Sequence, residues 1–421
     1  MLEFHQIVEQ VYRMGGMISN LPTDFADLMR LARQRFEASS DLDNVWERIQ
    51  WVRQPDVSGY RGAAPMDLSY AEPINGRFDA PESPPQATII ACDGSQVYPS
   101  EQSPWHYYLL NIGLFVFYHG LATTPDQYTF PQLKFHPSDV HDKYGRIITN
   151  RMVDDRRTVE ELRTLSEATK HFARGDVPVM AMYDNRLMYM PGNDGDDSQI
   201  LMNAFFQAMT SIRDSRASLV GYIDNPFRSK RFVQLLYLMS LKTQDEVKRM
   251  QRDLTKCGDL EGLRDREFFS YVLEPGQRSA VMVQNSPQNK EYRDEGRDFE
   301  IAFFYLKVVS ALNIDRVVRV DIPMWVARDR ESVDMVHSLI LSQCRLQGRN
   351  PYPYAITRAD ELAYVGGPDS KKLEELITME ARRVRQEIVG RTLTAKMRGK
   401  DLARSFKRYH NMMGQEMIDD N

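Results

Sequence analysis

The spacing of apolar and polar residues divides the chain into regions of different character. Apolar residues recur at helical spacing through 1–53, which predicts an N-terminal helical segment. Residues 54–86 are rich in proline and glycine and have no regular pattern. That composition predicts an extended arm or linker. From residue 87 onward, short apolar runs alternate with amphipathic stretches.

The apolar runs are short and rich in β-branched or aromatic residues, which predicts buried strands. They lie at 87–93, 106–120, 177–184, 218–224, 299–309 and 315–327, and Gly113 marks a possible hairpin bend. Helices are predicted at 156–174, 199–213, 228–241, 331–348, 359–366 and 368–388. Residues 121–150 predict a loop, and 242–298 give no clear pattern. Strands alternating with helices predict an α/β fold.

Composition narrows the functional classes. The net charge of -5 excludes a protein that binds polyanions through its overall charge, so any such binding needs a local basic surface or a metal. Three scattered cysteines without a CxxC pair argue against a zinc ribbon or a disulfide framework. The beginning of the chain does not resemble a signal peptide, and no long apolar run occurs. These features predict a cytoplasmic protein.

Three of the predicted strands end on an aspartate: Asp93, Asp184 and Asp224. Carboxylates at strand ends can gather at one edge of a sheet, where α/β folds bind ligands. Carboxylates held close together need a cation, and Mg²⁺ and Mn²⁺ prefer oxygen ligands. Two such ions can assist phosphodiester cleavage. The alternative is structural, because aspartate is also a common residue in turns and helix caps.

A further carboxylate stands on the predicted helix at 156–174. Glu160 and Glu161 cannot both face the sheet, because neighbours on a helix point about 100° apart. Glu161 lies on the side of Leu165 and is therefore the better candidate, although an exposed helix face is the usual place for a glutamate.

Basic residues supply candidate contacts to a nucleic acid. Arg228, Lys230 and Arg231 follow the third aspartate strand and could hold the DNA backbone by charge. Tyr352 or Tyr354 could stack on a base, with core packing as the alternative. Residues 367–421 predict a basic helical extension, which is either a phosphate-binding surface or a solvated tail. The chain has no GxxxxGK[ST] motif and so no P-loop ATPase site.

Several motifs together resemble the NurA family of DNA end-processing nucleases. They are ACDGSQVYPS with LLNIGLFVFYHG, RRTVEEL, VMAMYDNRLM, LVGYIDNPFRSKRFVQLL, RVVRVDIPMWVA and NPYPYAITRADELAYV, in family order between about 87 and 366. The resemblance implies a ribonuclease H-like core at 87–366, with a mixed sheet flanked by helices. It also implies a homodimer that works with a hexameric HerA-type translocase ATPase at DNA ends, associated with the nucleoid.

Carried over by motif, the resemblance implies catalytic and metal-ligating roles for Asp93, Glu161, Asp184 and Asp360, with Mn²⁺ or Mg²⁺. Two positions depart from the family pattern. Asn185-Arg186 replaces Gly-Ser, and Asp360 stands where histidine is common. Aspartate can still bind a hard cation. The leading interpretation is therefore a metal-dependent deoxyribonuclease. The alternatives are a weakened DNA-end-binding module that docks on a motor ATPase, and another phosphoryl-transfer enzyme acting on nucleotides or RNA.

Overall fold

The protein is described from a computed structural model that covers residues 4–19, 25–67, 70, 72–100, 103, 105–173, 175–192 and 197–384. The chain divides into two compact units. Unit 1 contains 1–87, 176–188 and 216–354, and unit 2 contains 88–175, 189–215 and 355–421. Each unit is assembled from segments that are distant in sequence. Most of the predicted basic extension, from residue 385 onward, lies outside the described residues.

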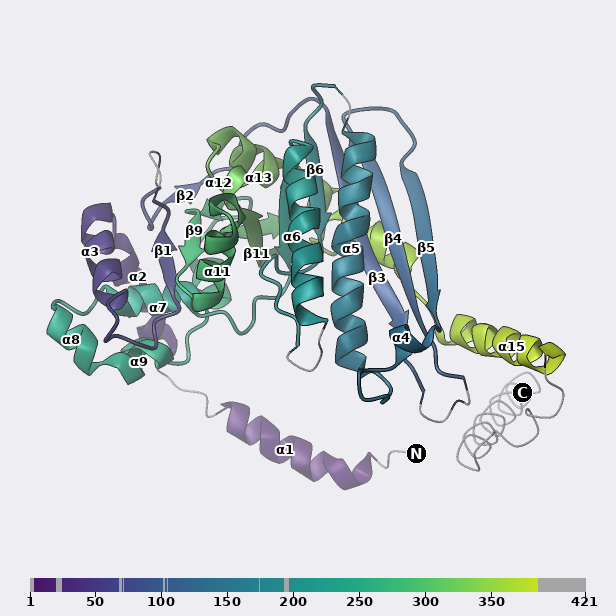
Figure 1. Cartoon of the computed structure of the whole chain (residues 1–421). Coiled ribbons are helices and arrows are strands. Elements are labelled where there is room, and N and C mark those ends of the chain that lie inside the picture. The colour runs from purple at the N-terminus through teal and green to yellow at the C-terminus, as the bar shows by residue number, and fades with distance from the viewer. Residues whose placement is uncertain are drawn as a thin grey trace, which may run out of the picture. The chain divides into compact units, whose positions relative to one another are not determined.

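Unit 2 is built on three neighbouring strands in the order β3-β4-β5. Strands β4 and β5 pair antiparallel, and Figure 1 shows the long helix α5 lying beside α6 along these strands. Thr149 caps α5 by accepting a hydrogen bond from the backbone N–H of Met152. The elements are β3 (Ala87–Val97), β4 (Tyr108–His119), β5 (Asp126–Lys134), α4 (Pro137–Val140), α5 (Asn150–Phe172), α6 (Ser198–Asp214), α14 (Tyr354–Ala363) and α15 (Gly367–Val384).

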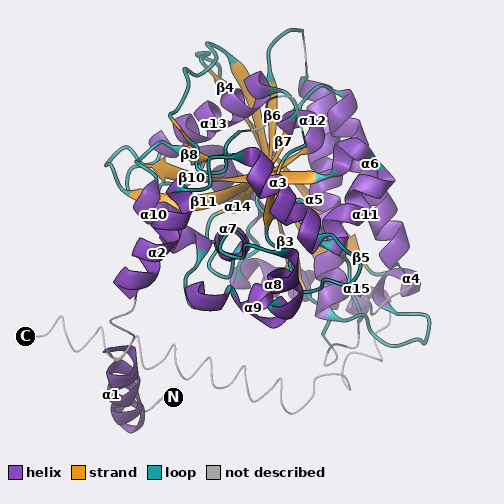
Figure 2. Ribbon diagram, turned by 90° about the vertical axis from the view of Figure 1, so that its left-hand side faces the viewer, coloured by secondary structure: helices purple, strands orange, loops and turns teal. Residues whose placement is uncertain are grey.

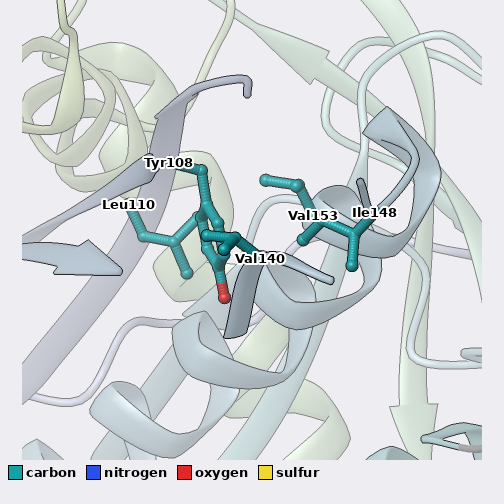
Figure 3. Packing of buried hydrophobic residues seen from close by; sticks show 5 residues of the cluster. All are labelled: Tyr108, Leu110, Val140, Ile148 and Val153. Carbon is teal, nitrogen blue, oxygen red and sulfur yellow. The ribbon is translucent and has the colours of Figure 1, made fainter. Parts of the chain in front are cut away.

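A small apolar cluster closes one end of unit 2. It joins β4 to α4 and to the beginning of α5, as Figure 3 shows. Its buried members are Tyr108, Leu110, Val140, Ile148 and Val153. The side chain of Arg156 connects the same region through hydrogen bonds to Tyr108 and to the backbone oxygen of Asp139. The cluster fixes where α5 begins, and therefore which of its residues lie against β3.

Unit 1 contains a mixed sheet in the order β1-β9-β10-β11-β7-β6. Strands β6 and β7 are parallel, whereas β10 and β11 pair antiparallel along nine residues each. These strands are β1 (Ala63–Pro65), β6 (Val179–Tyr183), β7 (Ser218–Ile223), β9 (Met282–Gln284), β10 (Ile301–Val309) and β11 (Asp315–Pro323). Two short strands, β2 (Arg77–Phe78) and β8 (Arg278–Ser279), pair with each other, and β8 also pairs with β10.

Unit 1 contains the remaining helices, and Figure 2 shows α8 and α9 side by side. They are α1 (His5–Ser19), α2 (Phe25–Glu37), α3 (Leu42–Val52), α7 (Arg231–Leu238), α8 (Gln244–Arg249), α9 (Gln251–Lys256), α10 (Asp265–Val272), α11 (Pro287–Glu295), α12 (Met324–Ala327) and α13 (Arg330–Arg345). Two 3₁₀ turns occur at Gly258–Leu260 and Arg297–Phe299. Within the described ranges, no helix is long and apolar enough to cross a membrane.

The mixed α/β prediction is confirmed, but several local predictions are wrong. The strand predicted at 315–327 ends at Pro323, and Met324–Ala327 form α12. The strand predicted to end on Asp93 continues to Val97, because the Asp-Gly pair that resembles a turn lies within the strand. The proposed bend at Gly113 does not exist, since β4 runs straight through that residue. The predicted loop at 121–150 contains β5 and α4. The sequence did not predict β5, because most of this strand is exposed and its apolar and polar residues do not alternate.

The proline-rich segment 54–86 contains ordered structure that its composition does not reveal. It supplies β1 and β2, which pair with β9 and β8. Buried Glu72 from the same segment makes two hydrogen bonds to the buried guanidinium of Arg278, with N–O distances of 2.8 and 2.7 Å. A buried charge is tolerated when it is paired in this way. Parts of the segment, including residues 63–66 and Glu72, are therefore built into the packed interior of unit 1.

Candidate active site

A row of polar contacts links α5 to β3 in unit 2. Residues 154, 157 and 161 lie on one side of the helix, where they meet alternate residues of the strand. Tyr98 donates to Asp154 over 2.7 Å, and the Nη1 atom of Arg157 donates to the side-chain oxygen of Gln96 over 2.8 Å. Nη1 of Arg157 also contacts the backbone oxygen of Gly94 at 3.3 Å. These contacts fix the rotation of α5 against the sheet.

Glu161 is the buried carboxylate of this row, with 5% of the residue exposed. Its Oε1 atom lies 3.2 Å from Nε of Arg157, an ion-pair distance, although that Nε makes no hydrogen bond. Gly94 is needed at this point, because a Cβ there would lie 2.5 Å from Oε1. Glu160 instead forms a hydrogen-bonded ion pair with Arg163 near the surface. Glu160 also accepts a hydrogen bond from Gln132 of β5, so both glutamates contact strands, and Glu161 is the more buried of the two.

Asp93 is half-buried, and alternation along β3 puts it on the opposite face from Gly94. Ser95 shares the face of Asp93 and donates a 2.5 Å hydrogen bond to the backbone oxygen of Ala363 in α14. Asn111 of β4 donates to the same oxygen over 2.8 Å. The structure thus brings Glu161 to the backbone beside Asp93, while Asp93 itself lies on the face that α14 covers.

Asp360 is an exposed residue of α14. The helix packs through Ala359 and Ala363, both buried, and Asp360 lies about 100° around the helix from Ala359. It therefore occupies the side of α14, on the face of the sheet that also carries Asp93. The close approach of α14 depends on Gly113, where a Cβ would be 2.3 Å from the backbone oxygen of Ala359.

Asp184 belongs to unit 1, where it directly follows β6. The hydroxyl of Tyr352 donates a 2.5 Å hydrogen bond to its Oδ1 atom. The ring of Tyr352 packs edge-on against Tyr222 of β7, with ring centroids 5.2 Å apart. The sequence offered only base stacking or core packing for Tyr352, because nothing in its pattern indicates which carboxylate its hydroxyl meets.

Asp224, the third strand-ending aspartate, has a structural partner. Both of its carboxylate oxygens accept hydrogen bonds from Nη1 of Arg316, at 2.8 and 2.6 Å. The hydrogen bond that Arg316 donates to Asp224 raises the pKa of Arg316. Asp224 therefore serves as one half of an ion pair at the end of β7.

The residues predicted to contact DNA differ in their exposure and in their hydrogen bonds. Arg228 is exposed and makes no hydrogen bond or ion pair with any residue the structure describes. Lys230 instead donates to the backbone oxygen of Thr255, and Arg231 donates to that of Arg61. Tyr354 is half-buried at the first position of α14. Of the three cations, Arg228 is the one whose charge is directed entirely to solvent.

Comparison with known proteins identifies the family of the chain. The NurA domain model matches residues 87–365, about two thirds of the chain. The chain belongs to the NurA family. A solved structure of the NurA nuclease from Sulfolobus solfataricus is 14% identical, with 91% of this chain and 98% of that chain covered and a TM-score of 0.43. A second structure, of NurA, is 11% identical over 71% of this chain and 89% of that chain, with a TM-score of 0.35. No protein in the curated set matches the chain.

The late motif of the NurA domain is built into the core. Arg319 and Asp321 of β11 are buried and joined by a 2.7 Å hydrogen bond from Nε to Oδ1. The Arg319 guanidinium also lies 4.0 Å from the centroid of the Phe303 ring. Each charge is therefore compensated by the other within the sheet, and removal of one partner would leave an uncompensated buried charge.

The chemical nature of the donors bears on metal binding by the NurA domain. Among the described residues, no group of three or more His, Cys, Asp or Glu side chains is arranged to hold a metal ion. On the α14 face, the candidate donors Asp93 and Asp360 are carboxylates. Oxygen donors of this kind fit a hard divalent cation such as Mg²⁺ or Mn²⁺. The donor type therefore fits the predicted cofactor.

Proposed function

We propose that this chain is a nuclease that hydrolyses phosphodiester bonds at DNA ends with the help of Mn²⁺ or Mg²⁺. Membership of the NurA family supports the nuclease activity. The structural observation that carries the proposal is the position of Asp93 in the middle of β3. Glu161 of α5 lies against Gly94, the next residue of that strand. We extend the proposal to a ribonuclease H-like arrangement of the core.

In this proposal Asp93 and Asp360 hold the cation. A divalent cation, when bound, would stabilise negative charge that develops on the phosphate during cleavage. Glu161 lies against the strand, and the neighbouring Arg157 offsets the cost of its burial. Arg228 contacts the DNA backbone through its solvent-directed guanidinium. Glu161 and Asp184 stay predicted ligands on the strength of the family motifs.

The proposal includes protein partners. The sequence has no P-loop, so movement along DNA would require energy from a separate ATPase, for which a HerA-type hexamer is the candidate. A second copy of the chain is the candidate for the exposed strand β5. Tyr128, Phe130 and Leu133 on this strand are 41%, 40% and 38% exposed. Exposed apolar side chains on an edge strand are a typical protein-binding surface.

The test is cleavage of end-labelled single- and double-stranded linear DNA in Mn²⁺, Mg²⁺ or EDTA. We expect cutting with either metal, none in EDTA, and a loss of roughly a hundredfold or more in Asp93→Asn, because the variant loses a charged ligand. Asp176→Asn is the matched control, since Asp176 is exposed and has no hydrogen bond or ion pair within the described structure. Circular dichroism would establish that both variants fold.

Two results would count against the proposal. DNA cleavage in EDTA at the same rate as in Mn²⁺ or Mg²⁺ would show that the activity needs no divalent cation. No cutting by the folded wild-type protein, with its ATPase partner supplied, would leave the DNA-binding module as the better interpretation. That module would still retain DNA in an electrophoretic mobility assay, whereas an enzyme for other phosphoryl compounds would not.

A further inference from the structure

Two adjoining cavities lie within unit 1, and none of the candidate metal ligands lines either of them. They have volumes of about 520 and 610 Å³ and share Arg53, Val283, Arg293 and Glu300 in their walls. The first cavity is also bounded by α3 and α12, and the second by the proline-rich segment and α11. Both are large enough for a small organic molecule.

The second cavity has an excess of positive charge. Four cationic side chains line it, and Glu300 is the one acidic residue in its wall. The cations are Arg53, Arg61, Lys290 and Arg293. They come from the end of α3, the proline-rich segment and α11, so the fold gathers them from three parts of the sequence. Ser286, which caps the beginning of α11, lines the same cavity.

These cations have few protein partners. Within the described structure, the guanidinium of Arg61 and the ammonium of Lys290 make no hydrogen bond or ion pair. Nε of Arg53 donates only to the neutral side chain of Asn285, at 3.3 Å. Nε of Arg293 lies 4.0 Å from Oδ1 of Asp294, the limit of an ion pair. Glu300 and Asp67 offset part of the charge of Arg53. The charges of Arg61 and Lys290 are left for an anion.

The pKa of Arg53 reflects the same surroundings. Burial lowers this pKa, and the neighbouring charge of Arg293 lowers it further, although Glu300 acts in the opposite direction. Burial also raises the pKa of Glu300, whereas the nearby arginines Arg293 and Arg53 act in the opposite direction. A bound anion would relieve the repulsion between Arg53 and Arg293.

The first cavity adds an aromatic wall. Trp46 of α3 is half-buried there, and the Arg53 guanidinium lies 5.3 Å from the centre of its ring. Pro65 and Met324 provide apolar surface beside it. An indole ring next to a cationic cavity can stack on a planar base while the cations bind the attached phosphate.

We propose that these cavities bind a phosphate-bearing nucleotide unit. The phosphate lies among Arg53, Arg61, Lys290 and Arg293, and the base stacks against Trp46. The same chemistry has two sources, a free nucleoside monophosphate or the 5′-phosphorylated end of a DNA strand. The proposal does not depend on nuclease activity, because it uses none of the candidate catalytic residues.

Calorimetric titration of the full chain with deoxyadenosine monophosphate, in EDTA, tests this site without the metal. We expect binding that weakens by roughly tenfold or more in the double variant Arg53→Gln/Arg293→Gln, because two charge-assisted contacts are lost. The double variant Arg252→Gln/Arg345→Gln is the matched control. Both of these arginines are exposed and unpaired within the described structure. Unphosphorylated deoxyadenosine should bind more weakly than the nucleotide by a similar factor.

Trp46→Leu separates the two halves of the site. It should weaken binding of the nucleotide but leave binding of inorganic phosphate unchanged. Undetectable nucleotide binding by the folded wild-type protein, or equal binding by both double variants, would overturn the proposal. Either result is distinguishable from failure of the nuclease proposal, because no cleavage is measured.

The source of the phosphate is decided with single-stranded oligonucleotides in EDTA. If the DNA end is the ligand, a 5′-phosphorylated oligonucleotide will bind more tightly than its 5′-hydroxyl counterpart, and Arg53→Gln/Arg293→Gln will remove the difference. If a free nucleotide is the ligand, deoxyadenosine monophosphate will show the arginine dependence and the two oligonucleotides will bind equally. Absence of arginine dependence in both arms would overturn the proposal.

Discussion

At the scale of single residues, one missing side chain determines where a charge can be buried. Gly94 leaves room for the carboxylate of Glu161 against β3, because any Cβ at position 94 would collide with Oε1. Arg157 then supplies the opposing charge from one turn earlier in α5. In the sequence, Asp93-Gly94 resembles a turn. In the fold, the same glycine leaves the space that the end of the Glu161 side chain occupies.

The hydroxyl of Tyr352 gives a prediction at this scale. Tyr352→Phe removes the hydrogen bond to Asp184 but keeps the ring that packs on Tyr222. If Asp184 takes part in cleavage, we expect the rate to fall roughly tenfold to a hundredfold, since hydrogen bonds to charged groups contribute about 1.5–3 kcal/mol. The measurement is DNA cleavage in Mn²⁺ with Tyr364→Phe, an exposed tyrosine, as control. An unchanged rate in Tyr352→Phe would show that this hydrogen bond is dispensable.

At the scale of elements, α14 connects the end of the NurA domain to its first strands. Its carbonyl groups accept hydrogen bonds from Ser95 of β3 and Asn111 of β4. Its backbone approaches β4 at Gly113, the residue at which the sequence indicated a bend. The glycine is explained by the helix that crosses the strand, and this helix is almost 250 residues away in the chain.

Gly113→Ala should therefore loosen α14. Both partners in the contact are backbone, so neither can move aside cheaply, and we expect a loss of roughly 1–3 kcal/mol in the free energy of unfolding. Urea denaturation measures it. Gly348→Ala is the control, because a Cβ at Gly348 would meet nothing within 4 Å. Equal stability of the two variants would contradict the packing of α14 on β4.

At the scale of the whole molecule, His337 couples stability to pH. It is buried in α13 and contacts the backbone oxygen of Gly276 through Nε2, at 2.8 Å. Burial lowers its pKa to about 4, against about 6.5 in an unfolded chain. Between about pH 4 and pH 6.5, this histidine binds more protons in the unfolded state than in the folded state. Stability is therefore complete above about pH 6.5 and falls as the pH drops toward 4.

This histidine should contribute a loss of roughly 3 kcal/mol across that interval. In His337→Gln, the free energy of unfolding should depend less steeply on pH than in the wild type, measured by urea denaturation at several pH values between 4 and 7. His171→Gln, which changes an exposed histidine of α5, should keep the wild-type dependence. Identical curves for His337→Gln and the wild type would show that the buried histidine is not the group responsible.

The sequence by itself determined the class of fold and the positions of most elements. Runs such as 179–183 and 218–223 are mostly apolar because nearly every residue in them is buried, and that composition is readable without coordinates. The motif order also led to the NurA family, which the family model confirms. Local patterns failed at β5, where exposed residues on both faces leave no alternation to detect.

Only the tertiary structure decided which charged residues meet. Asp93, Asp184 and Asp224 resemble one another in sequence, but Asp224 is paired with Arg316 and Asp184 accepts a hydrogen bond from Tyr352. The cations around Arg53 likewise come from segments up to about 240 residues apart. Such contacts depend on distances across the fold, and the periodicity of a sequence records only which face of its own element a residue occupies.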